Sequence, residues 1–388
     1  MKPFIKVFKI SNTKNKLSEV FDKQRIYGLD ILRALAILFV VILHGEYLLP
    51  DKLSRLTDLV VFDGVSIFFV LSGFLVGNIL IKTMAQNTPA VASLWQFWRR
   101  RWYRTLPNYF FVLTLLTILH LLFDKNFMGW SVLKYAVFAQ NLFTPHPLHF
   151  FPEAWSLSIE EWFYILVPLL AISFIYFGKL QPRMALLITV IMVIITITFF
   201  RYYRYVHSPA LNAEEWDLVF RKQVSTRLDS LVFGVLGAYC SFYYPGKWIR
   251  YKKQLFVAGI VFFLLIKFIL PHVTEISGLY QAVFSFTLVA VATLMLLPLL
   301  SSLQSGSGPL YKIISYISLI SYSMYLLNLS VIQDWIIHKI NWHTFIQNVY
   351  LLVIVKYTFY WLLVICLSAL LYHFFERPVT MLREKNKR

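Results

Sequence analysis

Cysteine is nearly absent from this chain, and its scarcity removes two classes of small domain. Two of the 388 residues are cysteine, Cys240 and Cys366, and each stands inside an apolar segment. Two isolated cysteines provide neither a disulfide framework nor the ligand spacing of a zinc site. We therefore expect both to pack as small buried hydrophobes, and we predict no metal and no permanently bound cofactor.

Charged residues are also scarce. They make up 14% of the chain, whereas soluble domains contain about 25%. Hydrophobic residues make up 59%, and the mean hydropathy is +0.64. The 35 Phe, 23 Tyr and 11 Trp suit contact with lipid and with the two membrane interfaces. This composition excludes a soluble enzyme and predicts an all-α polytopic protein with a multi-pass location in the cytoplasmic membrane.

No cleavable leader is recognisable. The first 25 residues are rich in Lys and Arg but contain neither an apolar core nor a small-residue cleavage site, so we expect a retained cytosolic tail. We predict three parts: a basic tail over 1–25, a membrane-embedded domain over 26–377 and a second basic tail over 378–388. Within the domain, about ten segments are long and apolar enough to cross a bilayer as helices. Their approximate limits are 28–48, 62–82, 104–123, 155–177, 184–203, 226–244, 255–271, 279–300, 312–333 and 349–375.

Acidic residues are few relative to basic ones. There are 19 Asp and Glu against 37 Lys and Arg, which gives a formal net charge of +18. Such an excess would suit nucleic acid if it gathered on one soluble surface. Instead, most basic residues fall in the segments that lie inside when the N-terminus is cytosolic, as the positive-inside rule requires. We therefore expect both termini in the cytosol and no nucleic-acid partner.

The first span carries ionisable residues that a simple anchor would lack. Arg33 and His44 are eleven residues apart, which closes to within about 20° of whole turns, so both side chains leave one helix face. Asp30 precedes Arg33 by three residues and points nearly the same way. Ionisable groups inside a membrane usually mark a pathway or a site. The alternative is a snorkelling Arg33 paired with Asp30 and a His44 at the outer interface.

Small residues interrupt the second span. Ser72, Gly73 and Gly77 would let a neighbouring helix approach closely. We favour this packing role for them over a direct contact with a ligand.

A basic cluster stands at the predicted cytosolic end of the third span. Arg101 and Arg104 are one turn apart and share a face, and Arg100 stands beside them with aromatic side chains in between. Guanidinium groups grip phosphates bidentately, so the cluster is a candidate phosphate clamp. The alternative is an interfacial anchor that follows the positive-inside rule.

The start of the fourth span, residues 154–168, combines serines with two glutamates. Ser158 and Glu161 match a capping box, in which each side chain bonds the backbone of the other at the helix start. That assignment gives Glu161 a structural task and leaves Glu160 available for another.

Glu160 shares its helix face with other polar residues. Ser156, Glu160 and Tyr164 are spaced by four and would line one face of the helix. Glu160 and His44 both lie near the outer ends of their spans. The carboxylate is therefore a candidate to orient the imidazole of His44 and to stabilise its protonated form.

Three further pairs of polar residues give weaker signals: Arg227 and Asp229, His146 and His149, and Lys267 and Lys356. The first pair begins the sixth span and would cap and anchor it. The second pair has metal-like spacing but no third ligand. The third pair lies within spans and would need carboxylate partners that the sequence does not identify.

Five motifs, in this order, resemble the integral-membrane acyltransferase family 3, which includes bacterial O-antigen and exopolysaccharide O-acetyltransferases. They are LDILRALAILFVVILH (29–44), GVSIFFVLSGFL (64–75), RRRWYRTLP (99–107), WSLSIEEWFY (155–164) and FFERP (374–378). The resemblance implies a ten-helix membrane domain that takes an acyl group, most often acetyl, from acyl-CoA at the cytosolic face. It implies delivery to a hydroxyl, usually on a sugar, at the outer face.

The resemblance also implies roles for individual residues. His44 corresponds to the essential histidine, and Arg33 to its accompanying arginine. Arg101 and Arg104, with Arg100 nearby, correspond to the arginines that bind acyl-CoA. The glutamate of the fourth motif corresponds to Glu160, and its other motif residues here are Trp155, Ser156 and Ser158.

The chain departs from the family pattern at two positions. Aspartate often follows Gly-Val in the second motif, where Ser66 stands, and histidine often ends a YLxxH-like segment, where Asn328 stands. The extracytoplasmic hydrolase-like domain fused to some members has no counterpart in these 388 residues. We therefore expect either direct transfer or a separate extracytoplasmic partner protein.

Direct O-acylation is the predicted reaction. His44 acts as general base on the acceptor hydroxyl, Glu160 supports the imidazole, and the arginine cluster holds the phosphates of acyl-CoA, the co-substrate. Arg33 steers the pantetheine arm or supports Asp30. A covalent acyl intermediate is an alternative, as is a lipid or protein acceptor in place of a glycan. A non-enzymatic transporter or flippase of a polysaccharide or lipid-linked sugar is a further alternative, although the inverted repeats typical of transporters are not visible.

Overall fold

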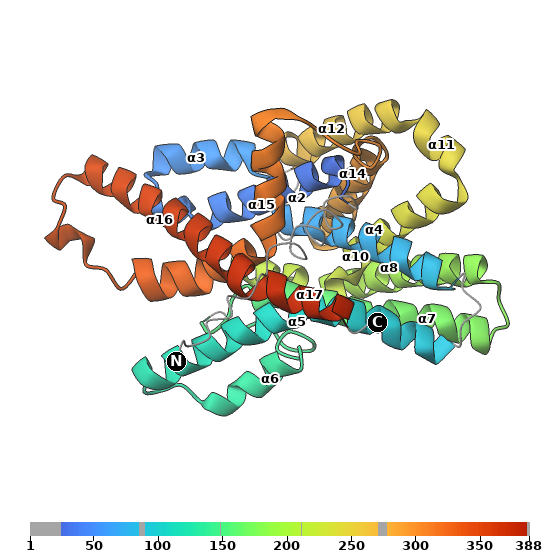
Figure 1. Ribbon diagram of the computed structural model, residues 1–388, viewed down its shortest axis with the longest axis horizontal. Coiled ribbons are helices and arrows are strands. Elements are labelled where there is room, and N and C mark those ends of the chain that lie inside the picture. Colours follow the sequence, from blue (N-terminus) through green and yellow to red (C-terminus); the bar gives the residue numbers. More distant parts are fainter. Residues whose placement is uncertain (1–24, 85–89, 148, 211, 271–277, 386–388) are drawn as a thin grey trace, which may run out of the picture.

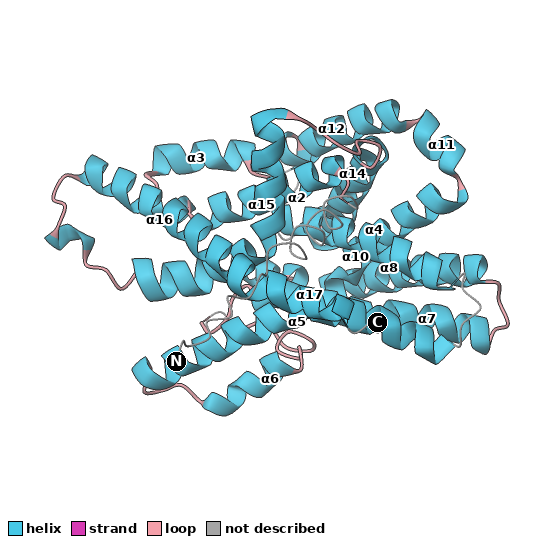
Figure 2. Cartoon of the chain, in the orientation of Figure 1, coloured by secondary structure: helices cyan, strands magenta, loops and turns pink. Residues whose placement is uncertain are grey.

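The computed structural model describes residues 25–84, 90–147, 149–210, 212–270 and 278–385. Within these residues the chain forms helices joined by loops and no strand (Figure 2), which confirms the predicted all-α class. The basic tail predicted over 1–25 lies outside the described residues except for Arg25, and residues 378–385 of the second predicted tail belong to a helix. The α-helices are α2 (Tyr27–His44), α3 (Asp51–Val60), α4 (Gly64–Met84), α5 (Ala90–Phe123), α6 (Val132–Ala136), α7 (Ala154–Tyr176), α8 (Pro182–His207), α9 (Ala213–Trp216), α10 (Val224–Tyr243), α11 (Pro245–Arg250), α12 (Lys252–Phe268), α14 (Ser285–Leu300), α15 (Gly308–Leu327), α16 (Val349–Leu371) and α17 (Arg377–Lys385).

Helices of membrane-crossing length dominate the fold. Among the described residues, 8 helical segments are long and apolar enough to cross a membrane, which confirms a multi-pass architecture. They are Tyr27–His44, Asp51–Met84, Leu94–Phe123, Ala154–Tyr176, Pro182–His207, Tyr280–Leu300, Gly308–Ile337 and Val349–Leu382. Two other predicted spans correspond to α10 and α12, which fall short of that standard. The helix α12 has 17 residues, and α10 contains Arg227 and Asp229.

The helix α10 is nevertheless central to the bundle. It packs against α4, α7, α8 and α14, and most of its residues are buried. A helix enclosed by protein can carry charged residues that a lipid-facing helix could not. Its closest neighbour is α4: a Cβ added at Gly73 would lie 1.8 Å from the carbonyl oxygen of Leu231, and one added at Gly234 would lie 2.1 Å from that of Val70. The predicted packing role of Gly73 is confirmed.

The helix α15 takes a different direction from its neighbours. In Figure 1 most of the long helices run from side to side across the view, while α15 crosses them steeply and packs against α2. The chain then continues directly into a π-helical segment, η5 (Asn328–Ile337). Segments of π-helix occur frequently at functional sites. This one begins at Asn328, one of the two positions that depart from the family pattern.

The helix α5 begins earlier than predicted. The sequence predicts a span over 104–123, whereas the helix starts at Ala90 and has 34 residues. The added segment is polar and aromatic, so its composition hides the helix from a search for apolar runs. As a result Arg101 and Arg104 lie in the interior of a helix, which fixes the direction of their side chains relative to each other.

The helix α7 begins within one residue of the predicted span but before the predicted cap. It starts at Ala154, so Ser158 lies in its second turn and cannot cap it. The hydroxyl of Ser158 donates instead to the carbonyl oxygen of Phe138, and Glu161 accepts a hydrogen bond from Nε1 of Trp102 at 3.1 Å. The predicted capping box is therefore wrong, and both of its members tie α7 to other parts of the chain.

The described residues between α5 and α7 form no helix long enough to cross a membrane. This segment contains the short helix α6 followed by irregular chain. Gln140 and Asn141 are buried in this segment and donate to the carbonyl oxygens of Ala154 and Trp155 at 3.1 and 2.9 Å. These bonds fix the loop against the first turn of α7.

Candidate functional site

Five helices enclose a small cavity inside the bundle. Its volume is about 110 Å³, and α2, α4, α5, α7 and α15 all contribute to its wall. The polar lining residues are Arg33, Ser72, Arg101, Arg104, Thr105, Ser156, Glu160, Tyr164, Ser321, Tyr322 and Tyr325. Sites for complete small molecules usually measure about 300 Å³ or more. The cavity is therefore suited to one end of a ligand or to a small group.

Three guanidinium groups converge on the cavity wall. Arg101 and Arg104 lie one turn apart on α5, and Arg33 comes from α2. Arg101 and Arg104 act electrostatically on Glu160, so cations and a carboxylate share one small space. The predicted common face of Arg101 and Arg104 is confirmed. Arg100 is not part of this lining, and its buried Nε has no hydrogen-bond partner among the described residues.

Glu160 belongs to a chain of hydroxyl groups in the cavity. Its carboxylate accepts from the hydroxyl of Tyr164 at 2.8 Å, and that hydroxyl lies 2.9 Å from Oγ of Ser72. On the neighbouring turn, Oγ of Ser156 lies 2.6 Å from the hydroxyl of Tyr325. Ser156, Glu160 and Tyr164 all line the cavity, which confirms that one face of α7 carries the three.

A larger vestibule of about 550 Å³ lies next to the cavity. Arg33 and Arg104 line both spaces, so the two are neighbours across these side chains. The vestibule wall also includes the start of α2, part of α15, the π-helical segment η7 (Tyr372–Glu376) and α17. Its charged residues are Arg25, Arg33, Arg104 and Arg377 on the basic side and Asp30 and Glu376 on the acidic side. This excess of guanidinium groups favours an anionic ligand.

Asp30 is held by several donors at the vestibule wall. Its side chain is buried, and Arg25 donates to both carboxylate oxygens at 2.9 Å. Ser318 donates through Oγ at 2.8 Å, and Arg33 approaches to 3.5 Å. The contact between Asp30 and Arg33 is the one that the sequence analysis offered as an alternative for this pair. These contacts give Asp30 the task of orienting the two arginines.

His44 has a different partner from the predicted one. Its Nδ1 lies 2.6 Å from Oδ1 of Asn328, and its carbonyl oxygen accepts from Nε2 of Gln333 at 2.7 Å. Glu160 bonds Tyr164 instead, and no hydrogen bond among the described residues joins it to His44. The predicted orientation of the imidazole by Glu160 is thus replaced by a contact with Asn328. Equal depth in the membrane does not by itself identify a partner.

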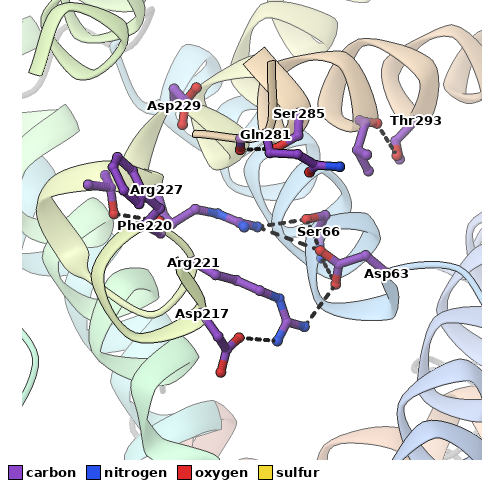
Figure 3. A network of polar contacts seen from close by, with 12 residues as sticks. Asp63, Ser66, Asp217, Phe220, Arg221, Arg227, Asp229, Gln281, Ser285 and Thr293 are labelled. Carbon is purple, nitrogen blue, oxygen red and sulfur yellow. Dashed lines mark hydrogen bonds and ion pairs between the residues drawn. The ribbon is translucent and has the colours of Figure 1, made fainter. Parts of the chain in front are cut away.

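A second polar network joins the start of α4 to the start of α10 (Figure 3). Arg227 is fully buried and donates to the hydroxyl of Ser66 at 2.6 Å, and Ser66 donates to Asp63 at 2.6 Å. Arg221 lies between Asp63 at 3.4 Å and Asp217 at 2.9 Å. Figure 3 shows both arginines directed toward Asp63. The sequence predicts only a capping and anchoring role for Arg227, so it misses this network.

A fully buried ion pair adjoins the network. Nη2 of Arg201 in α8 lies 2.7 Å from Oδ2 of Asp229 in α10, and both side chains are 0% exposed. Thr287 accepts from Arg201 at 2.8 Å and donates to Asp229 at 3.1 Å. Arg227 lies nearby, with its Cζ 4.0 Å from the centre of the Phe286 ring, a cation–π contact. In the sequence, the only indication of this ion pair is a basic residue, Arg201, near the end of one apolar span and an acidic residue, Asp229, near the start of the next.

Two carboxyl groups outside the membrane-crossing helices, Glu153 and Asp217, have pKa values shifted in opposite directions. Oε1 of Glu153, just before α7, accepts from two successive backbone N–H groups at the start of η5, at 3.1 and 2.8 Å. Burial raises the pKa of Glu153 to about 8, against the opposing hydrogen bonds from Ser330. Burial also acts to raise the pKa of Asp217, but Arg221 and Lys222 outweigh it and hold that pKa below its usual range. Asp217 therefore stays anionic, while Glu153 retains its proton up to higher pH.

The weaker candidates have local contacts. Nε2 of His146 lies 3.2 Å from the carbonyl oxygen of Phe151. Lys267 donates to the carbonyl oxygen of Val61, and Lys356 lies 5.8 Å from the centre of an aromatic ring. No group of three metal-ligating side chains occurs within the described part of the chain.

Comparisons with known proteins identify the family of this chain. A family model described as an acyltransferase domain matches residues 26–373. The chain is 29% identical over 183 residues to the peptidoglycan O-acetyltransferase OatA of Listeria monocytogenes, which covers 44% of this chain and 28% of that protein. It is 28% identical over 185 residues to the O-acetyltransferase OatA of Staphylococcus aureus, which covers 43% of this chain and 28% of that protein. The aligned part thus spans less than a third of each relative. No solved structure matches the chain.

Proposed function

This chain belongs to the acyltransferase-domain family, and we propose on that basis that it is a membrane O-acetyltransferase. The donor is acyl-CoA, most simply acetyl-CoA, and the acceptor is a hydroxyl of a cell-envelope glycan. The names of the relatives, which are O-acetyltransferases, support the reaction class. The assignment of acyl-CoA as the donor is supported by the adjoining cavity and vestibule, which share Arg33 and Arg104.

The two spaces match the two ends of an acyl-CoA. The vestibule has the larger volume and several guanidinium groups, which bind phosphates bidentately, so it receives the nucleotide end. The cavity has room for a small group only and receives the acyl thioester. Arg33 and Arg104, which line both, lie beside the pantetheine arm that connects the two ends. Tyr164 and Ser72 supply hydroxyl groups near the thioester, and Glu160 orders them.

His44 supplies the base for the acceptor. It removes the proton of the attacking hydroxyl, whose oxygen then forms a bond to the thioester carbon as the carbon–sulfur bond breaks. The CoA sulfur leaves as a thiolate and receives the proton from the imidazolium. Tyr325 lines the donor cavity, and Asn328, three residues further along the chain, contacts His44. The end of α15 thus connects the donor cavity to the base.

The two halves of the site lie at different depths. Arg33 and His44 are eleven residues apart on α2, which corresponds to about 16 Å along the helix axis. The vestibule is on the side of Arg25 and the start of α2. The distribution of basic residues predicts that this side faces the cytosol, where acyl-CoA is available. His44 is nearer the opposite side, where an exported glycan would approach. The arrangement suits transfer of an acyl group across the membrane.

Thermal unfolding of the detergent-purified chain tests the donor site. A ligand present at about 100 times its dissociation constant stabilises the folded state by about 2.7 kcal/mol. We expect acetyl-CoA to raise the unfolding temperature of the wild type and the variant Arg101→Gln with Arg104→Gln to lose that effect. Arg100→Gln makes the same chemical change once, on the same helix but outside both spaces, so it should keep the effect. No stabilisation of the wild type, or an equal loss in Arg100→Gln, contradicts the proposal.

Transfer itself is measured in proteoliposomes with radiolabelled acetyl-CoA and purified peptidoglycan strands. His44→Gln should retain the acetyl-CoA-dependent stabilisation and lose transfer. Full transfer by this variant would show that His44 is not the general base. Movement of a lipid-linked sugar across the bilayer, without binding of acetyl-CoA, would instead support the transporter alternative.

A further inference from the structure

The side-chain amide of Asn328 has one orientation that satisfies its surroundings. Its Nδ2 donates to the carbonyl oxygens of Met324 and Tyr325, which lie 2.9 and 2.8 Å away. Because carbonyl oxygens only accept hydrogen bonds, the amide nitrogen must face them. Oδ1 must then face Nδ1 of His44, 2.6 Å away. The residue is 0% exposed, so the choice is made by protein groups rather than by solvent.

This orientation decides where the proton of His44 lies. An amide oxygen is an acceptor only, so the contact requires a proton on Nδ1. In a neutral imidazole the lone pair is then on Nε2. Nε2 of His44 forms no hydrogen bond with any described residue, so it can receive a proton from a substrate.

The turn that carries Asn328 is itself anchored from both sides. On one side, Oε1 of Glu153 accepts from the backbone N–H groups of Leu329 and Ser330 at 3.1 and 2.8 Å and from Oγ of Ser330 at 3.2 Å. On the other side, the hydroxyl of Tyr325 donates to the carbonyl oxygen of Glu153 at 3.1 Å. Glu153 is buried as well. One glutamate thus joins the start of α7 to the junction between α15 and η5.

We propose that Asn328 is a positioning residue that holds His44 as the Nδ1-protonated tautomer with Nε2 as the base. Glu153 fixes the turn that presents the amide. The inference deepens the proposed function and rests on it, because a base is needed only if His44 takes a proton from the acceptor. A neutral amide here does the orienting that carboxylates do in many other sites. The charged groups that act on His44 through space are Arg221 and Lys222.

The tautomer can be observed without any acceptor. Nitrogen-15 NMR of the full chain, labelled at the histidine ring nitrogens, distinguishes a protonated from an unprotonated ring nitrogen, and the signals that vanish in His44→Gln belong to His44. We expect a proton on Nδ1 in the wild type and a mixture of both tautomers in Asn328→Ala. A wild-type proton on Nε2, or a tautomer that Asn328→Ala leaves unchanged, overturns the inference. Absence of acetyl transfer alongside the expected tautomer would count against the proposed function alone.

Kinetics separate positioning from a merely structural role. Asn328→Ala should lower kcat at least about 100-fold, as for a misplaced catalytic group, with the KM for acetyl-CoA unchanged because the amide does not line the donor spaces. Asn328→Asp places a carboxylate beside the imidazole, which favours its protonated form and moves the acidic limb of the kcat–pH profile to higher pH. A wild-type kcat in Asn328→Ala, or an unshifted profile in Asn328→Asp, overturns the inference.

The anchor has its own matched pair of variants. Glu153→Ala removes the acceptor of the two backbone N–H groups and should lower kcat as Asn328→Ala does, while the stabilisation by acetyl-CoA persists. Glu153→Gln keeps an oxygen in the same position and should restore most of the lost rate. Equal rates in the two Glu153 variants would show that the turn does not depend on this acceptor.

Discussion

Removal of one partner of the buried ion pair between α8 and α10 should destabilise the fold severely. In Arg201→Met the carboxylate of Asp229 keeps its contact with Thr287 but loses both guanidinium contacts, at 2.7 and 3.3 Å, in surroundings that exclude solvent. Breaking a buried pair in this way costs about 3–5 kcal/mol, because the buried carboxylate loses its directly bonded cation and keeps only the more distant Arg227. The double variant Arg201→Met with Asp229→Leu removes both charges and should come back to within about 1–2 kcal/mol of the wild type, since apolar replacements of buried pairs are often nearly neutral.

Reversible unfolding of the detergent-solubilised chain by a denaturing detergent provides the free energies for this comparison. Arg55→Met, which makes the same chemical change at an exposed position on α3, is the control and should stay within about 0.5 kcal/mol of the wild type. A free energy of unfolding for Arg201→Met equal to that of Arg55→Met would show that the buried pair contributes nothing. A double variant as unstable as the two single losses added together would show that the two side chains do not interact.

Stability should also fall as the pH rises past neutrality. The pKa of Glu153 is about 8 in the folded state and 4.5 in the unfolded state, so the folded state binds more protons between pH 4.5 and 8. Burial lowers the pKa of His146 from 6.5 to about 4, which makes stability rise with pH below pH 6.5. Between pH 6.5 and 8, thermal unfolding should therefore show a loss of stability of about 2 kcal/mol, and Glu153→Gln should remove this loss. Where α4 meets α10, Gly73→Ala should cost about 2 kcal/mol or more, because its Cβ would overlap the carbonyl oxygen of Leu231. Gly246→Ala, which meets no atom within 4 Å, should change the free energy of unfolding by less than about 0.5 kcal/mol.

Contacts within a single helix were predictable from the sequence. Asp30 meets Arg33, and Arg101 shares a face with Arg104, because a spacing of three residues fixes the relative direction of two side chains in any helix. The same rule placed Glu160 beside its neighbours on α7. Composition alone gave the all-α multi-pass class, since the requirement to satisfy the backbone in lipid leaves long apolar segments little choice but the helix.

Contacts between helices were not predictable in the same way. His44 and Asn328 are 284 residues apart, and their contact depends on how α15 crosses α2. Depth along a span restricts a partner to a layer of the membrane, and several polar side chains share each layer. Glu160 was predicted as the partner of His44 from its depth, whereas the packing of the helices brings Asn328 into contact with His44. The predicted start of α5 was wrong for another reason. The first turns of this helix are polar and aromatic, and a search for apolar runs does not detect them.

Both positions that depart from the family pattern take part in contacts between helices. At the first, Ser66 stands where aspartate is common, and its hydroxyl accepts from Arg227 while it donates to Asp63. The carboxylate of Asp63 lies one helical turn earlier, with an oxygen 4.0 Å from the guanidinium of Arg227. Because the hydroxyl of Ser66 both accepts and donates, it connects the buried guanidinium to this carboxylate. At the second departure, where histidine is common, the amide oxygen of Asn328 contacts the imidazole of His44. At both positions the residue that is present forms a hydrogen bond to a buried polar group of another helix, so neither position is without a polar contact.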